Sequence, residues 1–162
     1  MSENLSYSIR KVGIFNIPAL LRVSGILYKC GKDMAEKYDL HHWDNSHLKN
    51  WIIVALCALK NKIYLVYDGS GAAVATFQTR KLGSSYLFLK LATLPELAGR
   101  GVGSFCLSEI ERLASEVECS EVICEVYDKS EHAKSFYEKR GYTPYGTAET
   151  LKYTEIKLKK EL

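Results

Sequence analysis

The apolar residues near the start of the chain recur first with the period of a strand and then with that of a helix. Alternation over residues 7–12 predicts a strand. Asn16 and Pro18 then begin a helix, whose apolar positions keep a spacing of about 3.6 residues as far as Gly31. A further helical piece is expected over residues 34–38.

A second amphipathic helix is predicted after residues 44–46, which offer N-cap side chains. Its apolar residues share one helical face, and this face is expected to pack in the core. They are Leu48, Trp51, Ile52, Ala55, Leu56 and Leu59.

From residue 62 the apolar period changes to that of strands. Three strands are expected over residues 63–67, 72–79 and 86–93, with turns at residues 68–71 and around Gly83. Short glycine-containing turns between alternating runs are typical of antiparallel hairpins. The segment therefore predicts a three-stranded meander.

The C-terminal part of the chain returns to alternating helices and strands. A helix is expected to open at Val102, followed by a strand over residues 121–127, a helix over 130–140, and strands near 142–145 and 150–158. The inward positions of the first of these helices are Val102, Phe105, Cys106, Ile110, Leu113 and Val117.

The order of these elements is β-α-α-β-β-β-α-β-α-β-β, and no repeat, low-complexity stretch or linker interrupts it. One mixed α/β layer is the expected architecture, with residues 1–162 as a single domain. The composition agrees, since 47% hydrophobic and 25% charged residues suit one domain with a sizeable core.

The charge balance argues against nucleic-acid and membrane partners. Twenty-two Lys and Arg against nineteen Asp and Glu leave a net charge of +3, and no long run of like charge is present. The longest apolar run, residues 51–59, is too short to cross a bilayer, and the N-terminus lacks the pattern of a signal peptide. A cytoplasmic location is expected.

Cysteine and histidine spacing predicts neither disulfides nor a metal site. The five cysteines are odd in number and contain no Cys-x-x-Cys pair, so reduced and mostly buried thiols are expected. His41, His42 and His47 cluster without cysteine or carboxylate at ligand spacing. The cysteines are Cys30, Cys57, Cys106, Cys119 and Cys124.

The most informative segment is a buried strand followed by a glycine-rich turn and a helix start, at residues 89–104. Gly99, Gly101 and Gly103 remove side chains where backbone N–H groups can crowd round a ligand, and the helix beginning at Val102 adds its positive dipole end. A phosphate or pyrophosphate would fit there. On the glycines alone, a turn that merely caps the helix is the alternative.

Other glycine-rich nucleotide sites do not match this segment. A dinucleotide-binding turn would follow the first strand as Gly-x-Gly-x-x-Gly, and a nucleotide-hydrolysing loop would contain Gly-Lys-Ser or Gly-Lys-Thr. The cluster here comes late in the chain and is Gly-x-Gly-x-Gly.

Two stretches together with the element order resemble the GNAT superfamily of N-acetyltransferases, which transfer an acetyl group from acetyl-CoA to an amine. The first is Ala98-Gly-Arg-Gly-Val-Gly103, and the second is Ser135-Phe-Tyr-Glu-Lys-Arg-Gly-Tyr142. The resemblance implies a mixed, mostly antiparallel sheet flanked by helices. Ala98 departs from the Gln or Arg that the family usually has there, which removes one polar contact and leaves the backbone available.

The resemblance also implies how the cosubstrate acetyl-CoA is held. Strand residues would pair through their backbone with the pantetheine arm, as an added strand does, and the glycine-rich turn would wrap the pyrophosphate. The strand residues are Leu91, Ala92 and Thr93, and those of the turn are Gly99, Arg100, Gly101, Val102, Gly103 and Ser104.

In the second motif, Ser130 replaces the Asn that usually heads the next helix, and Tyr137 is retained. Both positions are expected to contact the cosubstrate. A phenol with a pKa of about 10 stays protonated at neutral pH, so Tyr137 would donate a proton to the departing CoA thiolate. Without the resemblance, an aromatic residue packed on a helix face is the alternative.

Direct transfer needs a neutral amine, and Glu125 on the preceding strand is the candidate general base, directly or through water. A solvent-facing Glu paired with a Lys is the alternative. Backbone N–H groups near Ala92 or Leu94 could polarise the thioester carbonyl.

The sequence leaves the acceptor open among a small-molecule amine, an antibiotic and a peptide N-terminus. An edge-strand homodimer is also open. A non-catalytic acyl-CoA-binding or regulatory domain is the rival function, because both departures fall at ligand-contacting positions, whereas the retained Tyr137 favours an enzyme. Residues that could line an acceptor channel are Tyr28, Tyr38, His41, His42, Trp43, Tyr142 and Tyr145.

Overall fold

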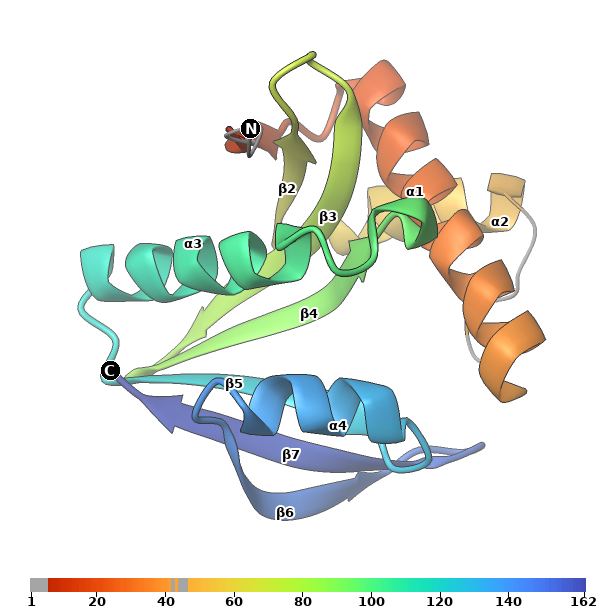
Figure 1. Ribbon diagram of the computed structural model, residues 1–162. Coiled ribbons are helices and arrows are strands. Elements are labelled where there is room, and N and C mark those ends of the chain that lie inside the picture. Colours follow the sequence, from red (N-terminus) through yellow and green to blue (C-terminus); the bar gives the residue numbers. More distant parts are fainter. Residues whose placement is uncertain (1–5, 42, 44–46) are drawn as a thin grey trace, which may run out of the picture. The chain divides into compact units, whose positions relative to one another are not determined.

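The computed structural model describes residues 6–41, 43 and 47–162, with the backbone alone for residues 47–50 (Figure 1). The expected order of strands and helices is confirmed, with one added 3-10 turn. The elements are β1 (Ser8–Val12), α1 (Ile17–Tyr38), α2 (His47–Cys57), β2 (Lys62–Tyr67), β3 (Ala73–Leu82), β4 (Ser85–Thr93), η1 (Pro95–Leu97), α3 (Val102–Glu116), β5 (Glu121–Tyr127), α4 (Glu131–Glu138), β6 (Thr143–Glu149) and β7 (Thr154–Glu161).

The strands follow the order β1-β2-β3-β4-β5-β7-β6. The chain gathers into two compact units. The first holds the residues up to Thr79 together with Lys90–Glu109, and the second holds Arg80–Leu89 and Ile110–Leu162. The boundary between the units passes through β3, β4 and α3.

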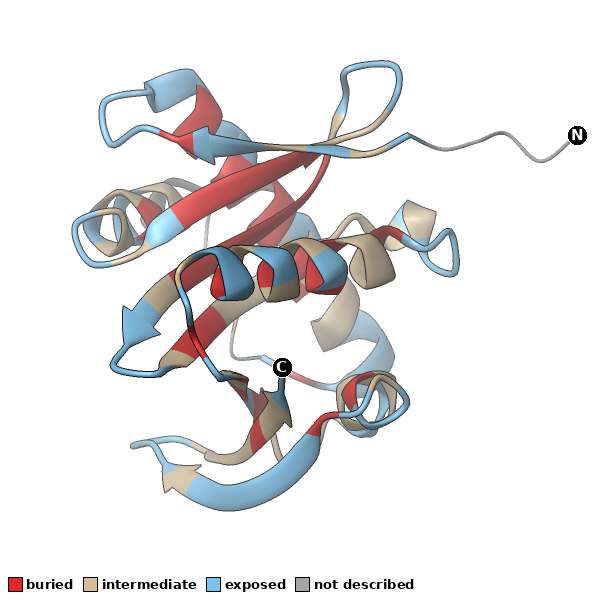
Figure 2. Cartoon of the chain, turned by 90° about the vertical axis from the view of Figure 1, so that its left-hand side faces the viewer, coloured by how far each residue is buried: buried red, intermediate tan, exposed pale blue. Residues whose placement is uncertain are grey.

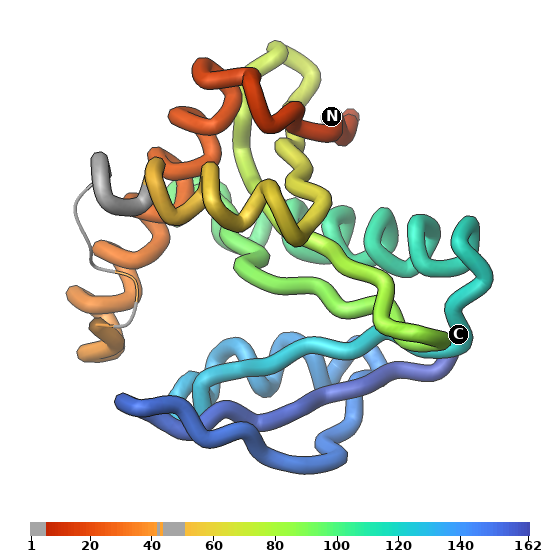
Figure 3. Tube along the Cα trace, turned by 180° about the vertical axis from the view of Figure 1, so that it is seen from behind, coloured from red at the N-terminus to blue at the C-terminus, as the bar shows by residue number. Residues whose placement is uncertain are grey.

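The first unit is built on antiparallel strands covered by α1 and α2. Ser8 of β1 pairs with Tyr67 of β2, and Lys62 of β2 pairs with Thr79 of β3. Figure 3 shows α1 and α2 side by side. Apolar burial holds these layers together, and the buried core residues are Val12, Ala19, Leu20, Val23, Ile26, Leu27, Val54, Ile63, Leu65 and Ala92.

Helix α1 begins where the sequence predicts but is longer than expected. The Asn16 side chain accepts a hydrogen bond from the Ala19 N–H at 3.2 Å, as an N-cap does. The helix then continues for 22 residues to Tyr38, so the expected break at Gly31 is wrong. Gly31 is buried, and a Cβ built on it would lie 2.4 Å from the Trp43 carbonyl oxygen. The glycine therefore permits close packing inside the helix.

Helix α2 turns a different face to the core than its sequence predicts. Ile52, Leu56 and Leu59 are exposed by 52%, 60% and 69%, so their expected burial is wrong. This stretch is apolar on two adjacent faces, and periodicity alone cannot choose between them. The expected cap at residues 44–46 and the side chain of Leu48 lie outside what the structure describes. Residues that do join the core are Trp51, Val54, Ala55 and Ala58.

The second unit contains one parallel strand pair and two antiparallel ones. Residues Ser85–Leu87 of β4 pair in parallel with Glu121–Ile123 of β5, and β7 pairs antiparallel with both β5 and β6. The strand β6 runs further than expected and β7 begins later, at Thr154. Buried residues alternate with more accessible ones along β5. Figure 2 shows how far each described residue of the chain is buried.

The contact at Gly31 generates a stability prediction. Ala in place of Gly inside a helix ordinarily stabilises a protein by about 0.5–1 kcal/mol, but here the added methyl group meets the backbone at Trp43. We expect Gly31→Ala to lower the free energy of unfolding by about 1–3 kcal/mol, measured by urea denaturation. Gly13→Ala, whose added Cβ has nothing within 4 Å, is the control and should change stability by less than about 0.5 kcal/mol. Equal effects of both variants would contradict this reading.

Candidate functional site

The turn between β4 and α3 is coiled tightly by its own backbone hydrogen bonds. The N–H groups of Leu97, Ala98 and Arg100 donate to the carbonyls of the third residue before each, at 3.0, 3.1 and 3.2 Å. These bonds form the turn η1 and bring the chain directly into α3. The helix opens at Val102, as the sequence predicts.

Gly99 and Gly101 adopt the left-handed backbone conformation, with φ of 77° and 81°. A Cβ built at either residue has nothing within 4 Å, so both face open space. The first backbone bond of the helix runs from Phe105 N–H to the Gly101 carbonyl at 2.9 Å. The backbone N–H groups of the first turn of an α-helix point out of its start, where they can donate to a bound group. This geometry fits an anion at the helix start.

Tyr7 supports the glycine-rich turn from the start of the chain. Its hydroxyl donates to the Arg100 carbonyl at 3.2 Å, and its ring lies 5.5 Å from that of Phe105. Sequence reasoning missed this residue because nothing in the local pattern distinguishes it from any strand-end aromatic. Tertiary structure alone brings it to the turn.

The strand leading into the turn is fixed in the first unit's core at Ala92, which is 1% exposed, while Leu91 and Thr93 are half-buried. Lys90 interrupts the strand with a φ of 50°, a local irregularity of the kind found in bulges. The Leu94 N–H donates to the Val74 carbonyl at 2.9 Å. The Leu94 N–H is therefore engaged by β3, and polarisation of a thioester by N–H groups near Ala92 or Leu94 stays a prediction.

In the second unit, Tyr137 lies on α4 and is 8% exposed. Its ring centroid lies 5.8 Å from that of Phe88, 5.2 Å from Phe136 and 5.8 Å from Tyr142. The ring is thus held in a cluster of aromatic side chains.

Ser130 occupies the N-cap position of α4, as expected from the motif. Its carbonyl accepts from Lys134 N–H at 3.0 Å and its own N–H donates to the Tyr127 carbonyl at 2.9 Å. Within the described part of the chain, its hydroxyl makes no cap bond to the first turn of the helix. Ser130 therefore begins the helix through its backbone.

Glu125 is exposed on β5, opposite Lys157 of β7 in the strand register. Its carboxylate interacts with that of Glu155, the residue opposite Tyr127 on the same strand pair. Burial, followed by the charge and hydrogen bond of Glu125, raises the pKa of Glu155. A carboxyl pair of this kind can hold and pass on a proton. Sequence reasoning missed Glu155, because only strand pairing brings it beside Glu125.

The residues expected to line an acceptor channel differ in how far they are exposed. Tyr145 is 47% exposed, and burial together with the negative charge of Glu125 raises its pKa. Tyr142 is only 1% exposed, so it is a core residue and its expected place in an accessible channel is wrong. His42 lies outside the described residues.

Burial also governs the cysteines. It raises the pKa of Cys30 to about 11 and that of Cys106 to about 12, and it raises the pKa of Cys124 as well. Thiols of this kind are poor nucleophiles at neutral pH. The three cysteines are therefore structural.

Comparisons with known proteins identify the family. The model of the Acetyltransferase (GNAT) family matches residues 28–142, so this chain belongs to that family. Among curated proteins, none matches. Within the described residues, no helix has the length and apolar character needed to cross a bilayer.

Solved structures share the fold at low sequence identity. An IAA acetyltransferase from Bacillus cereus has a TM-score of 0.69 at 16% identity, covering 97% of this chain and 100% of its own. A PaiA N-acetyltransferase from Thermoplasma acidophilum, in complex with coenzyme A, has 0.67 at 18%, covering 97% and 99%. The ribosomal-protein-S18-alanine N-acetyltransferase from Escherichia coli has 0.70 at 12%, covering 96% and 94%. The expected GNAT fold is confirmed.

The raised pKa of Glu155 generates a pH prediction. The native state binds this proton more tightly than the unfolded state, so the contribution of Glu155 to stability falls as the pH rises from 4.5 to its native pKa. Glu155→Gln does not titrate. We therefore expect the free energy of unfolding of Glu155→Gln, minus that of the unchanged protein, to rise with pH and then level off. Urea denaturation at about pH 4.5, 6 and 7.5 measures this difference, and a constant difference would contradict the pairing.

Proposed function

We propose that this protein is an N-acetyltransferase that transfers the acetyl group of acetyl-CoA to a primary amine. The observation that carries the proposal is the turn at Gly99 and Gly101, whose left-handed backbone faces open space at the start of α3. Backbone N–H groups at such a helix start suit a pyrophosphate. Membership of the GNAT family supports the same ligand, as does the likeness to a structure that contains coenzyme A.

The residues of the first unit have the task of binding. The backbone of Leu91, Ala92 and Thr93 would take the amide-bearing pantetheine arm as an added strand. Burial of Ala92 holds that strand in place before the ligand arrives, which lowers the entropy lost on binding. The pyrophosphate would rest on the backbone of residues 99–104.

The residues of the second unit have the task of moving protons. The amine nitrogen attacks the thioester carbonyl carbon, a C–N bond forms and the C–S bond breaks. Tyr137 donates its phenolic proton to the leaving sulfur, and Glu125 takes the proton that the amine loses. Glu155, whose carboxyl group interacts with that of Glu125, gives that proton a second carboxyl group to share. The acceptor is proposed only as a primary amine, of a small molecule or of a peptide N-terminus.

A non-catalytic acyl-CoA-binding domain is the second candidate. Two observations favour it: Ala98 lacks a polar side chain beside the turn, and the Ser130 hydroxyl makes no cap bond. Such a domain would bind acetyl-CoA without turnover, so binding and turnover are measured separately in the two experiments below.

Acetyl-CoA should stabilise the folded protein. At about 100 times its Kd, a ligand that binds only the native state adds about 2.7 kcal/mol, or a rise of about 5–10 °C in Tm. Gly101→Ala should weaken binding about ten-fold, because an alanine is strained at this φ and its methyl group enters the open space. Thermal unfolding with and without acetyl-CoA measures both effects.

Gly71→Ala is the matched control, since Gly71 has a φ of 84° and open space but lies in the turn between β2 and β3. It should lose similar stability while keeping the full acetyl-CoA shift. Absence of any shift in the unchanged protein at millimolar acetyl-CoA would overturn the proposed function.

Removing the Tyr137 hydroxyl should slow turnover without loss of binding. General acid catalysis contributes at least about 100-fold, so Tyr137→Phe should lower kcat by about that factor and keep the acetyl-CoA shift. Release of the CoA thiol across a panel of primary amines measures the rate. Tyr64→Phe, which changes a buried tyrosine of β2, should leave kcat unchanged. A Tyr137→Phe rate equal to that of the unchanged protein would exclude Tyr137 as the acid.

A further inference from the structure

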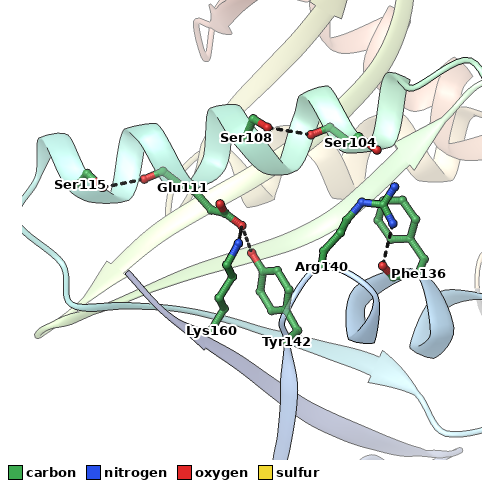
Figure 4. Close-up of polar contacts among 8 residues, drawn as sticks. All are labelled: Ser104, Ser108, Glu111, Ser115, Phe136, Arg140, Tyr142 and Lys160. Atoms are coloured by element: carbon green, nitrogen blue, oxygen red, sulfur yellow. Dashed lines mark hydrogen bonds and ion pairs between the residues drawn. The ribbon is translucent and has the colours of Figure 1, made fainter.

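A single carboxylate on α3 joins that helix to β7 and to the segment between α4 and β6. Glu111 on α3 accepts a hydrogen bond from the Tyr142 hydroxyl at 3.2 Å and forms an ion pair with Lys160 of β7 at 2.8 Å, both through Oε1 (Figure 4). The Lys160 ammonium also lies 5.8 Å from the centre of the Tyr142 ring. We call Glu111, Tyr142 and Lys160 the Glu111 clamp.

The clamp fixes a buried ring. Tyr142 is 1% exposed, so its hydroxyl needs a partner inside the protein. Burial, and then the negative charge of Glu111, raises the pKa of Tyr142. The phenol therefore stays protonated and remains a hydrogen-bond donor to the carboxylate across the working pH range.

Tyr142 contacts Tyr137 through both its backbone and its ring. Its N–H donates to the Tyr137 carbonyl at 3.2 Å, and the two rings meet nearly edge to face at 5.8 Å. Gly141, with a φ of 88°, turns the chain sharply between them. Phe88 lies beside both rings, 5.8 Å from Tyr137 and 6.1 Å from Tyr142. A shift of the Tyr142 ring would therefore move the boundary of the space that Tyr137 fills.

Phe136, a second aromatic neighbour of Tyr137, is held independently of the clamp. The Arg140 guanidinium lies 3.7 Å from the centre of the Phe136 ring and donates to the Phe136 carbonyl at 2.8 Å (Figure 4). The Phe136 ring meets Tyr137 at 5.2 Å. Tyr137 is thus enclosed by one aromatic neighbour fixed within its own helix and another fixed by the clamp.

We propose that the Glu111 clamp positions the Tyr137 ring for proton donation, so that Glu111, Lys160 and Tyr142 are positioning residues of the transfer reaction. The inference rests on the proposed role of Tyr137 as general acid. Proton transfer requires placement to a fraction of an ångström, and a ring held only by apolar contacts can slide in its cavity. A hydrogen bond from the neighbouring ring to an ion-paired carboxylate restricts that movement.

The first test compares variants that keep or remove the hydrogen bond. Tyr142→Phe and Glu111→Ala should lower kcat about ten-fold and leave the Kd for acetyl-CoA unchanged. Glu111→Gln keeps an oxygen that can accept from both Tyr142 and Lys160, as Oε1 of Glu111 does, so it should retain kcat within about two-fold. The rate is CoA release with the best amine of the panel, or hydrolysis of acetyl-CoA where no amine reacts.

Val122→Ala is the control for general loss of stability, because Val122 is fully buried on β5 and outside the clamp. If this variant loses as much kcat as Tyr142→Phe at a similar fall in Tm, the positioning role is overturned. Rates for Glu111→Gln as low as those for Glu111→Ala would also overturn it.

A double-mutant cycle with Tyr137→Phe shows whether the clamp acts through Tyr137. In that background, Tyr142→Phe should have no further effect on kcat, and an undiminished effect would overturn the inference. Failure of the proposed function looks different, because the unchanged protein would then show no acetyl-CoA shift. Failure of the proposed acid role would appear as a full rate in Tyr137→Phe alone.

A measurement without acceptor completes the test. In protein carrying 13C-labelled tyrosine and bound to acetyl-CoA, the Tyr137 ring signal should shift or broaden in Tyr142→Phe and Glu111→Ala. It should keep its position in Glu111→Gln and Val122→Ala. An unchanged Tyr137 signal in Tyr142→Phe would show that the clamp does not position the ring.

Discussion

The left-handed backbone at Gly99 and Gly101 is the constraint on which the first unit depends. On one side of these glycines the chain is fixed by Ala92, and on the other by Val102, both almost fully buried. The chain must reverse between these anchors within a few residues, and L side chains resist the φ values involved. Glycine removes this strain and leaves open space beside the first N–H groups of α3. Chain reversal and anion binding are therefore satisfied by the same residues.

Strand β7 has an equally central place in the second unit, because its two faces do different work. Glu155 shares the face that carries Glu125 and Tyr127 of β5, whereas Lys160 shares the opposite face with Leu158. The first face carries Glu155, which pairs with the candidate base Glu125. The second face supplies Lys160, the cation of the Glu111 clamp. A one-residue slip in the register of β7 would exchange these faces and disrupt both arrangements together.

Much of this protein is determined by local patterns in its sequence. The order of strands and helices, the limits of β5, the start of α3 and the cap at Asn16 all follow from periodicity and capping residues. The sequence also predicts the glycine-rich turn, because closely spaced glycines favour a left-handed backbone of the kind seen at Gly99 and Gly101. The same two motifs indicated the GNAT family, to which the chain belongs.

Where a local pattern allows two structures, tertiary packing decides between them. The apolar stretch of α2 offers two faces, and packing chose the one with Val54. Gly31 could end a helix or permit close packing, and the position of Trp43 selects the second. Nothing in the sequence links Tyr142 to Glu111 and Lys160, or Glu125 to Glu155. Pairing between segments far apart in the chain brings each group together, and such long-range contacts leave no periodic signal along the chain.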